Sequence, residues 1–420
     1  MVPVKDGMPY LVFTLKSVLK QDFDDAEIIV SVPADDRPSL DFVTRLNDSR
    51  LRVLDCPPGL SMTEHWDWVQ THARGDWQMY LGQDDGLQEN FFTLAEELVG
   101  RAEDLNLNLV ASKRAYIHWP ESRFDPDGRG LVKRQSGRFI YVRNLRKDSM
   151  AALLGNKEYF ELPQMYTTSL FNSSLLKECR AKQGGPLLTC HPQDANLAAA
   201  ARAFETRYLF SEVPLGWVGT SKKSAGAAIS SRQDGKNTAG REEYELSEQY
   251  LASISSSAWS YPEWAGSFEL SDVRIYFWQA LLTTKRIQPK RLMWLLQRRE
   301  FIQIMLGRCV AASIFETSPN RGQLEIIAEK NGTNLGILFR IATSAFFTSS
   351  WLRKLALKVR LVVKSLIMNR TSSLLPNAGS SPAGLPTEPP FSDGRTPLGR
   401  STLPTTRAKN TWRLKIGASK

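Results

Sequence analysis

The sequence predicts an α/β protein in which helices cover both faces of a mostly parallel sheet. Short apolar runs alternate with stretches whose apolar residues recur at helical spacing, and this order favours parallel strands joined by helices. The β-branched run Ile28-Ile29-Val30 is typical of a strand buried on both faces. A second apolar run, 77–81, ends abruptly in the polar turn Gly82-Gln83-Asp84-Asp85-Gly86. The expected class is therefore a Rossmann-like α/β fold.

The first part of the chain supplies most of the predicted alternation. Apolar residues at Leu11, Leu15 and Val18 predict the helix 10–20. The expected helix 63–73 should be capped by Ser61 or Thr63, both good capping residues. The expected strands are 2–4, 28–30, 51–54, 77–81 and 107–112, and the expected helices are 10–20, 40–47, 63–73 and 90–101.

Composition divides the rest of the chain. Residues 120–138 are rich in Gly, Pro, Arg and Asp and predict an excursion or loop. Beyond it we expect a helix at 174–182, an Ala-rich helix at 195–204, a strand at 208–213 and a Gly/Ser/Lys/Arg-rich loop at 219–240. These patterns predict three regions: an α/β domain at 1–240, a helical region at 241–370 and a disordered tail, rich in Ser, Pro and Thr, at 371–420.

Composition also excludes several classes of protein. The chain has no run of about 18 uncharged apolar residues, so no transmembrane helix is expected. No charged leader with an apolar core opens the sequence, so no signal peptide is expected. The net charge of +10 lies mostly late in the chain, and no nucleic-acid motif accompanies it. Four cysteines without Cys-x-x-Cys spacing argue against structural zinc and indicate buried thiols in a reducing compartment.

Asp84 and Asp85 are the first candidate site. They follow a predicted buried strand, and α/β sheets bind ligands at the carboxyl ends of their strands. Adjacent carboxylates repel each other unless a cation or solvent separates them, and a hard divalent cation binds one or two carboxylates together with substrate phosphates. The pair therefore indicates a metal-assisted site for a phosphorylated substrate; the alternative is a solvated acidic turn.

Several segments in order resemble family 2 glycosyltransferases of the GT-A fold, of a subgroup that acts in bacterial surface-polysaccharide synthesis. The match covers roughly residues 2–230. The matching segments are the first strand and turn at 2–11, the helix and strand at 17–23 and 27–30, Leu60-Ser61-Met62-Thr63-Glu64-His65-Trp66, Gly82-Gln83-Asp84-Asp85-Gly86 and Gly219-Thr220-Ser221-Lys222-Lys223-Ser224-Ala225-Gly226.

The resemblance implies a nucleotide-diphosphate sugar as donor, with a UDP-sugar favoured. Pro3 and Asp6 would lie on the nucleotide-contacting strand and turn, and Asp35 or Asp36 would accept hydrogen bonds from the base or the ribose. The alternative for Asp35 and Asp36 is a solvated turn. Asp85 would be the principal ligand of Mg²⁺ or Mn²⁺, and Asp84 would support it or contact the ribose.

The resemblance also implies a reaction that inverts the anomeric centre and needs one general base. Asp194 is the candidate base; capping of the Ala-rich helix is its alternative role, and His191 is the second candidate base. Lys222 and Lys223 would pair with the donor phosphates, or else be solvated loop lysines.

Three aromatic residues and two departures from the family pattern remain. Trp119, Tyr166 and Trp217 could stack on sugar rings, although core packing is the more common role of such residues. Gln83 stands where the family usually has Asp, so one carboxylate of the family pattern is absent and activity or metal binding is most open to change at this position. The chain also begins almost inside the first strand.

A basic amphipathic helix is predicted at 351–369. Its basic residues fall on one face and its apolar residues on the other, a pattern typical of helices that lie on anionic membranes. The alternative is an ordinary helix that packs on the domain. A membrane surface would suit an acceptor that is a lipid-linked sugar.

The sequence therefore predicts a cytoplasmic, metal-dependent, inverting glycosyltransferase, and peripheral association with the inner membrane face stays open. Its acceptor would be the hydroxyl of a saccharide or a lipid-linked sugar, and no nucleic-acid partner is expected. Two alternatives stay open: a sugar nucleotidyltransferase, and an inactive relative that binds a nucleotide sugar.

Overall fold

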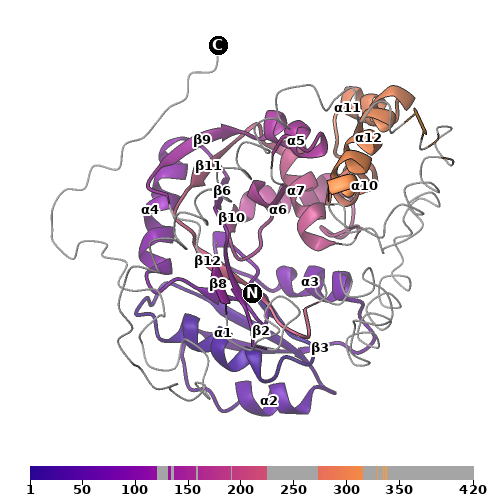
Figure 1. Cartoon of the computed structure of the whole chain (residues 1–420). Helices are drawn as coiled ribbons and strands as arrows, with labels where there is room; N and C mark the ends of the chain where they lie inside the picture. Colours follow the sequence, from indigo (N-terminus) through magenta and orange to yellow (C-terminus); the bar gives the residue numbers. More distant parts are fainter. Residues whose placement is uncertain are drawn as a thin grey trace, which may run out of the picture.

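The computed structural model confirms the α/β class (Figure 1). It describes residues 1–120, 131–133, 137–157, 159–190, 192–224 and 273–315, and the single positions 329, 334, 336 and 337. The predicted helix at 351–369, the predicted tail at 371–420 and most of the loop at 219–240 lie outside the described residues, as does His191.

The first sheet is parallel throughout and has the order β1-β2-β3. Its strands are β1 (Val2–Pro3), β2 (Ile28–Pro33) and β3 (Leu51–Cys56). The β-branched residues of β2 are buried, as the sequence predicts. The helices that follow these strands are α1 (Tyr10–Leu19), α2 (Arg37–Val43) and α3 (Met62–Thr71).

Met1 links this sheet to the next one. Its amino group donates to the Met79 carbonyl at 2.9 Å, and the Leu81 amide donates to the Met1 carbonyl at 2.9 Å. The expected strand 77–81 is thus interrupted: β4 covers Trp77–Gln78, and Tyr80 forms a separate parallel bridge to Tyr166. Segment 79–81 therefore continues the sheet from β1 and delivers the turn 82–86 at its carboxyl end.

The second sheet is mixed, with the order β4-β10-β6-β11-β9. Its remaining strands are β10 (Ser169–Asn172), β6 (Leu109–Ser112), β11 (Arg207–Ser211) and β9 (Ile140–Asn144). The strand β10 is antiparallel to both of its neighbours, whereas β6 and β11 are parallel. This mixed sheet, joined through segment 79–81 to the parallel sheet β1-β2-β3, agrees with the GT-A fold that the sequence resemblance implies.

A smaller sheet of order β5-β12-β7-β8 lies beside the turn 82–86. Its strands are β5 (Gly86–Leu87), β12 (Gly216–Thr220), β7 (Ala115–His118) and β8 (Leu131–Lys133). β8 falls inside the region 120–138, where composition predicts a loop. Because β5 begins at Gly86, its pairing with β12 fixes the turn against the chain just before Ser221.

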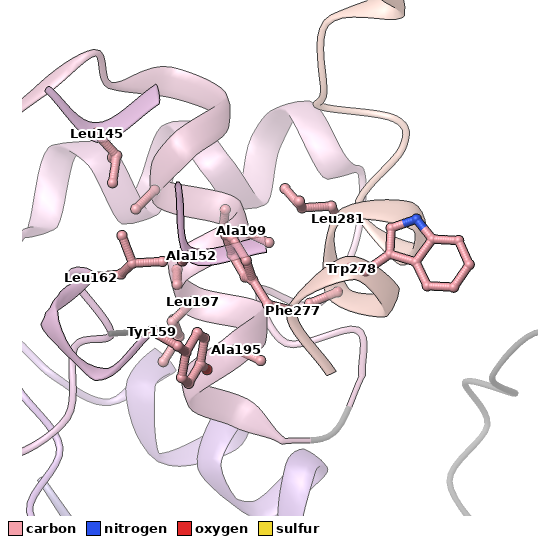
Figure 2. Packing of buried hydrophobic residues seen from close by; sticks show 14 of the residues in the cluster. Leu145, Ala152, Tyr159, Leu162, Ala195, Leu197, Ala199, Phe277, Trp278 and Leu281 are labelled. Atoms are coloured by element: carbon pink, nitrogen blue, oxygen red, sulfur yellow. The ribbon is translucent and has the colours of Figure 1, made fainter. Parts of the chain in front are cut away.

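The carboxyl-terminal helices share a core with the α/β domain (Figure 2). Ala195, Leu197 and Ala199 of α7 lie beside Phe277 and Leu281 of α10, and Leu145 and Ala152 of α5 belong to the same cluster. Trp278 points away from α7 and donates to the Leu296 carbonyl of α11 at 3.1 Å. Gln288 also donates to the Ala199 carbonyl at 2.8 Å. The remaining helices are α4 (Phe91–Asp104), α5 (Leu145–Leu153), η1 (Tyr159–Glu161), α6 (Ser173–Gln183), α7 (Gln193–Phe204), α10 (Val273–Thr283), α11 (Lys290–Leu296) and α12 (Arg299–Phe315).

Within the described ranges, no helix has both the length and the apolar character needed to cross a bilayer. All four cysteines are buried free thiols, as the sequence predicts.

Candidate active site

The turn 82–86 holds a buried pair of carboxylates. Asp85 is 1% exposed and Asp84 is 9% exposed, so the solvated acidic turn is excluded. The Thr14 hydroxyl lies 2.7 Å from both the Gln83 and the Asp85 carbonyl oxygens, which ties the turn to α1. These two bonds therefore fix the turn against α1.

Asp85 accepts hydrogen bonds from three separate parts of the chain. The Gly219 amide donates to Oδ1 at 2.6 Å, the Gly82 amide donates to Oδ2 at 3.0 Å, and the Thr167 hydroxyl donates to Oδ2. Burial and the negative charge of Asp84 raise the pKa of Asp85 to about 6, although these bonds and one from Tyr166 act to lower it. Asp85 thus carries a negative charge that its surroundings do not fully stabilise.

Asp84 is held mainly by the chain beyond β12. Its Oδ2 accepts from the Ser221 hydroxyl at 2.7 Å and also from the Ser224 hydroxyl. Burial raises the pKa of Asp84 despite these bonds. The Asp84 carbonyl accepts from the Trp119 indole at 2.8 Å, and Trp119 packs edge-on against Tyr10.

Gly219 is required for this close approach. A Cβ at this position would lie 1.7 Å from the Asp84 carbonyl oxygen, so any side chain forces the backbone apart. We expect Gly219→Ala to lower the free energy of unfolding by about 1–3 kcal/mol, because the Gly219 amide would leave Asp85; on the metal site proposed below, it should also weaken Mn²⁺ binding.

Gly100→Ala on α4 is the matched control for this substitution. No atom lies within 4 Å of a Cβ at Gly100, so the change should be neutral or stabilising by about 0.5–1 kcal/mol. Chemical denaturation and calorimetric titration with Mn²⁺ measure both effects. Parental stability and parental metal affinity in Gly219→Ala would contradict the assigned contact.

The contacts of Gln83 explain why this position holds Gln and not the Asp of the family pattern. Its Oε1 accepts from the Lys5 amide at 2.8 Å and its Nε2 donates to the Lys5 carbonyl at 2.9 Å. An Asp side chain is one methylene shorter and has no N–H, so it could not make the same two-point contact. Gln83 thus positions the β1–α1 loop rather than adding a third carboxylate.

The motif 60–66 begins α3 and packs against Tyr166, which bonds Asp85. Ser61 and Glu64 form a reciprocal capping box, so Ser61 rather than Thr63 caps α3. Trp66 stacks on Tyr166 with ring centroids 5.7 Å apart, and Tyr166 in turn bonds Asp85. The left-handed backbone of Met165 and Thr167, at φ 51° and 27°, turns Tyr166 toward the pair and marks a strained segment at the site.

The expected donor-binding residues surround the β1–α1 loop. Asp36 is buried and accepts from the Ser39 and Gly7 amides, both at 3.3 Å, so it caps α2 and holds the loop instead of forming a solvated turn. Pro3 is buried in β1, whereas Asp6 and Asp35 are exposed at its carboxyl side. Lys223 donates to the Asp6 and Met8 carbonyls at 2.9 and 3.0 Å, and thus links the chain after β12 to this loop.

Lys222 is half-buried beside Lys223. Trp119 and Trp217 are 3% and 4% exposed, which supports their core interpretation, whereas Tyr166 is half-buried at the carboxylate pair.

Asp194 lies in the first turn of α7 among buried polar groups. Its Oδ1 accepts from the Ala195 amide at 2.8 Å within the first turn, whereas the N-cap position is Pro192 and has no side-chain cap bond, so the capping alternative is wrong. Burial raises the pKa of Asp194, and the cation of Arg114 opposes this shift. The pKa of Tyr159 is raised well above its usual value by burial and by Asp194.

Arg114 acts electrostatically on both carboxylate sites, and the sequence did not predict this role. Its positive charge lowers the pKa values of both Asp194 and Tyr166, the residue that bonds Asp85. The guanidinium is buried, bonds Gln164 and lies over the Phe160 ring at 4.3 Å, and its Nε has no partner in the structure. A basic pair at the end of strand 107–112, Lys113-Arg114, was the available signal.

No family model matches this sequence, and no curated protein matches it. The chain is similar to solved structures of S. aureus TarS. A structure of TarS 1-349 in complex with UDP-GlcNAc has 13% sequence identity, covers 79% of this chain and 91% of that chain, and gives a TM-score of 0.41. A second TarS 1-349 structure has 14% identity, covers 79% and 90%, and gives 0.42; its complex with UDP has 14% identity, covers 79% and 91%, and gives 0.38. At these identities and TM-scores, the function of this chain rests on its own residues.

Proposed function

We propose that this chain is a metal-dependent, inverting glycosyltransferase that takes a sugar from a UDP-sugar. The observation that carries the proposal is the buried pair Asp84 and Asp85 at the end of segment 79–81, with both pKa values raised. From the sequence motifs we further propose a role in the synthesis of a cell-surface polysaccharide.

The donor set of the pair fits a hard divalent cation. Two adjacent carboxylates with raised pKa values carry negative charge that burial penalises, and Mg²⁺ or Mn²⁺ needs only one or two carboxylates beside substrate phosphates. Asp85 and, as a supporting ligand, Asp84 would hold the ion, which would supply charge neutralisation for the departing nucleotide diphosphate. Among the described residues no cluster of three or more His, Cys, Asp or Glu side chains offers an alternative metal site.

The nucleotide would bind where three parts of the chain meet. The β1–α1 loop is fixed from one side by Gln83, from a second by Asp36 and from a third by Lys223. Asp6 and Asp35 remain exposed there to accept hydrogen bonds from base or ribose. Lys222 and Lys223 would pair with the diphosphate, and Lys223 would exchange its two carbonyl partners for phosphate oxygens.

Asp194 would act as the general base. Its carboxylate takes the proton of the acceptor hydroxyl while that oxygen bonds the anomeric carbon, and the bond from this carbon to the nucleotide diphosphate breaks. Burial raises the pKa of Asp194 toward the operating range of a base, and the nearby charge of Arg114 keeps the ionised form accessible.

A thermal-shift screen of nucleotide sugars with and without Mn²⁺ tests the donor proposal. We expect one UDP-sugar to raise the melting temperature, and Mn²⁺ to enlarge the rise. Protons compete with the ion for Asp85, whose pKa is about 6, so the enlargement should be greater above this pH than below it.

The same pKa also sets the behaviour of the metal-free protein. The raised pKa of Asp85 stabilises the fold at low pH, and that stabilisation is lost as pH rises from the ordinary aspartate pKa of 3.8 through about 6. A donor response that is independent of Mn²⁺ at every pH would contradict the metal site. Donor binding without release of UDP, in the presence of saccharide and lipid-linked acceptors, would instead favour the inactive relative.

A further inference from the structure

The carboxyl-terminal helices carry a surface that the proposed reaction does not use. Trp294 on α11 is 57% exposed and Ile304 on α12 is 44% exposed, the two largest exposures among large apolar side chains of the described residues. Burying an exposed Trp or Ile is favourable, and Trp is enriched at interfaces, so this part of the chain is a candidate interaction surface.

Basic residues are frequent in the segment that carries Trp294. Residues 285–304 contain six Lys or Arg and a single acidic residue, Glu300. We call the exposed basic residues together with Trp294 the α11 surface. It consists of Lys285, Arg286, Lys290, Arg291, Trp294, Arg298 and Arg299.

The fold fixes which side of α11 faces outward. Leu292 and Leu296 are buried against the neighbouring helices, which leaves Lys290, Arg291 and Trp294 exposed on the other side. The Arg298 guanidinium lies over the Trp294 ring, 3.9 Å from its centroid. Figure 1 shows α11 and α12 at the outer edge of the molecule, beyond α5 and α7.

We propose that the α11 surface docks on an anionic lipid bilayer. Tryptophan is enriched at the level of lipid headgroups, and each Lys or Arg near an anionic membrane strengthens binding about fivefold. A row of long basic side chains around one exposed indole suits a surface of mobile negative charges. α10 packs against α7, whose first turn carries Asp194, so docking would tether the candidate base close to the membrane.

An environment-sensitive label tests this contact in the full chain. All four native cysteines are buried, so Trp294→Cys can be labelled selectively, with Asp41→Cys on α2 as the exposed control. On vesicles of phosphatidylglycerol and phosphatidylcholine at about 0.1 M salt, the label at 294 should shift to the blue and the label at 41 should not. Neutral vesicles should leave both unchanged.

Charge reversal provides the second arm. Lys290→Glu, Arg291→Glu and Arg298→Glu combined should weaken vesicle binding at least tenfold. The control triple Lys16→Glu, Arg45→Glu and Arg207→Glu, at exposed positions on other elements, should stay within about twofold of the parent. A third variant, with Arg353, Lys354 and Lys358 changed to Glu, measures the predicted helix at 351–369 separately.

Parental melting temperature and parental Mn²⁺ response in the α11 variant establish that it is folded. Parental vesicle binding by that variant would overturn the proposal, as would a label at 294 that responds to soluble dextran sulfate but not to anionic vesicles.

Discussion

Asp85→Asn is expected to abolish the Mn²⁺ response and to reduce kcat/KM at least about a hundredfold, because the proposed metal contributes several kcal/mol of transition-state stabilisation. The metal-free variant should melt close to the temperature of the parent. An amide removes the penalties that burial and Asp84 place on the charged form of Asp85, but its NH₂ cannot accept from the Gly82 amide that bonds Oδ2, so a gain and a loss oppose each other. Differential scanning calorimetry with and without Mn²⁺, paired with a UDP-release assay, measures both effects.

Two controls make this result specific. Asp41→Asn removes an exposed carboxylate on α2 and should change neither quantity. Gln83→Ala removes the contact with Lys5 but no charge, so it should weaken donor binding while the response to Mn²⁺ alone persists. If Asp85→Asn binds Mn²⁺ and donor as the parent does, the metal site is assigned to the wrong residue.

Asp194→Asn is expected to lower kcat by about 10²–10⁴, the usual contribution of a general base, with little change in donor affinity. The asparagine carbonyl can still accept from the Ala195 amide, so this local bond survives and only the proton acceptor is lost. Single-turnover kinetics measure the first effect, and calorimetric titration with the donor measures the second. A residue that only supports the first turn of α7 would leave kcat close to the parental value.

The pH dependence of kcat offers an independent check on Asp194. Its acid limb should follow ionisation of Asp194, whose pKa burial raises. Arg114→Gln removes the cation that opposes this shift, so the limb should move to higher pH. An unchanged limb in Arg114→Gln would mean that another group titrates.

The sequence predicted the features that depend on residues adjacent in the chain. The buried strand β2 follows from its β-branched run, and the turn 82–86 follows from Gly and Asp after an apolar segment. The α/β class and the place of Asp84 and Asp85 at a strand end could be predicted for this reason. The orientation of β10 could not, since the run Ser169–Asn172 shows no β-branched signal and its reversal depends on the backbone of Met165 and Thr167.

The contacts that complete the site join residues far apart in the chain. Thr14, Thr167 and Gly219 reach Asp85 across 71, 82 and 134 residues of sequence. None of the three carries a local pattern that predicts a ligand-supporting role, because each bond exists only once separate strands and helices are packed. The role of Gln83 could not be predicted either, because its contact with the Lys5 backbone exists only in the folded chain.

The packing of α10 against α7 also constrains how the protein is made. α7 is synthesised well before α10, so the face that later packs against Phe277 and Leu281 has no such cover while the intervening chain is still being translated. Exposed apolar surface on a growing chain promotes aggregation and recruits chaperones. We therefore expect this part of the core to form only after α10 has left the ribosome.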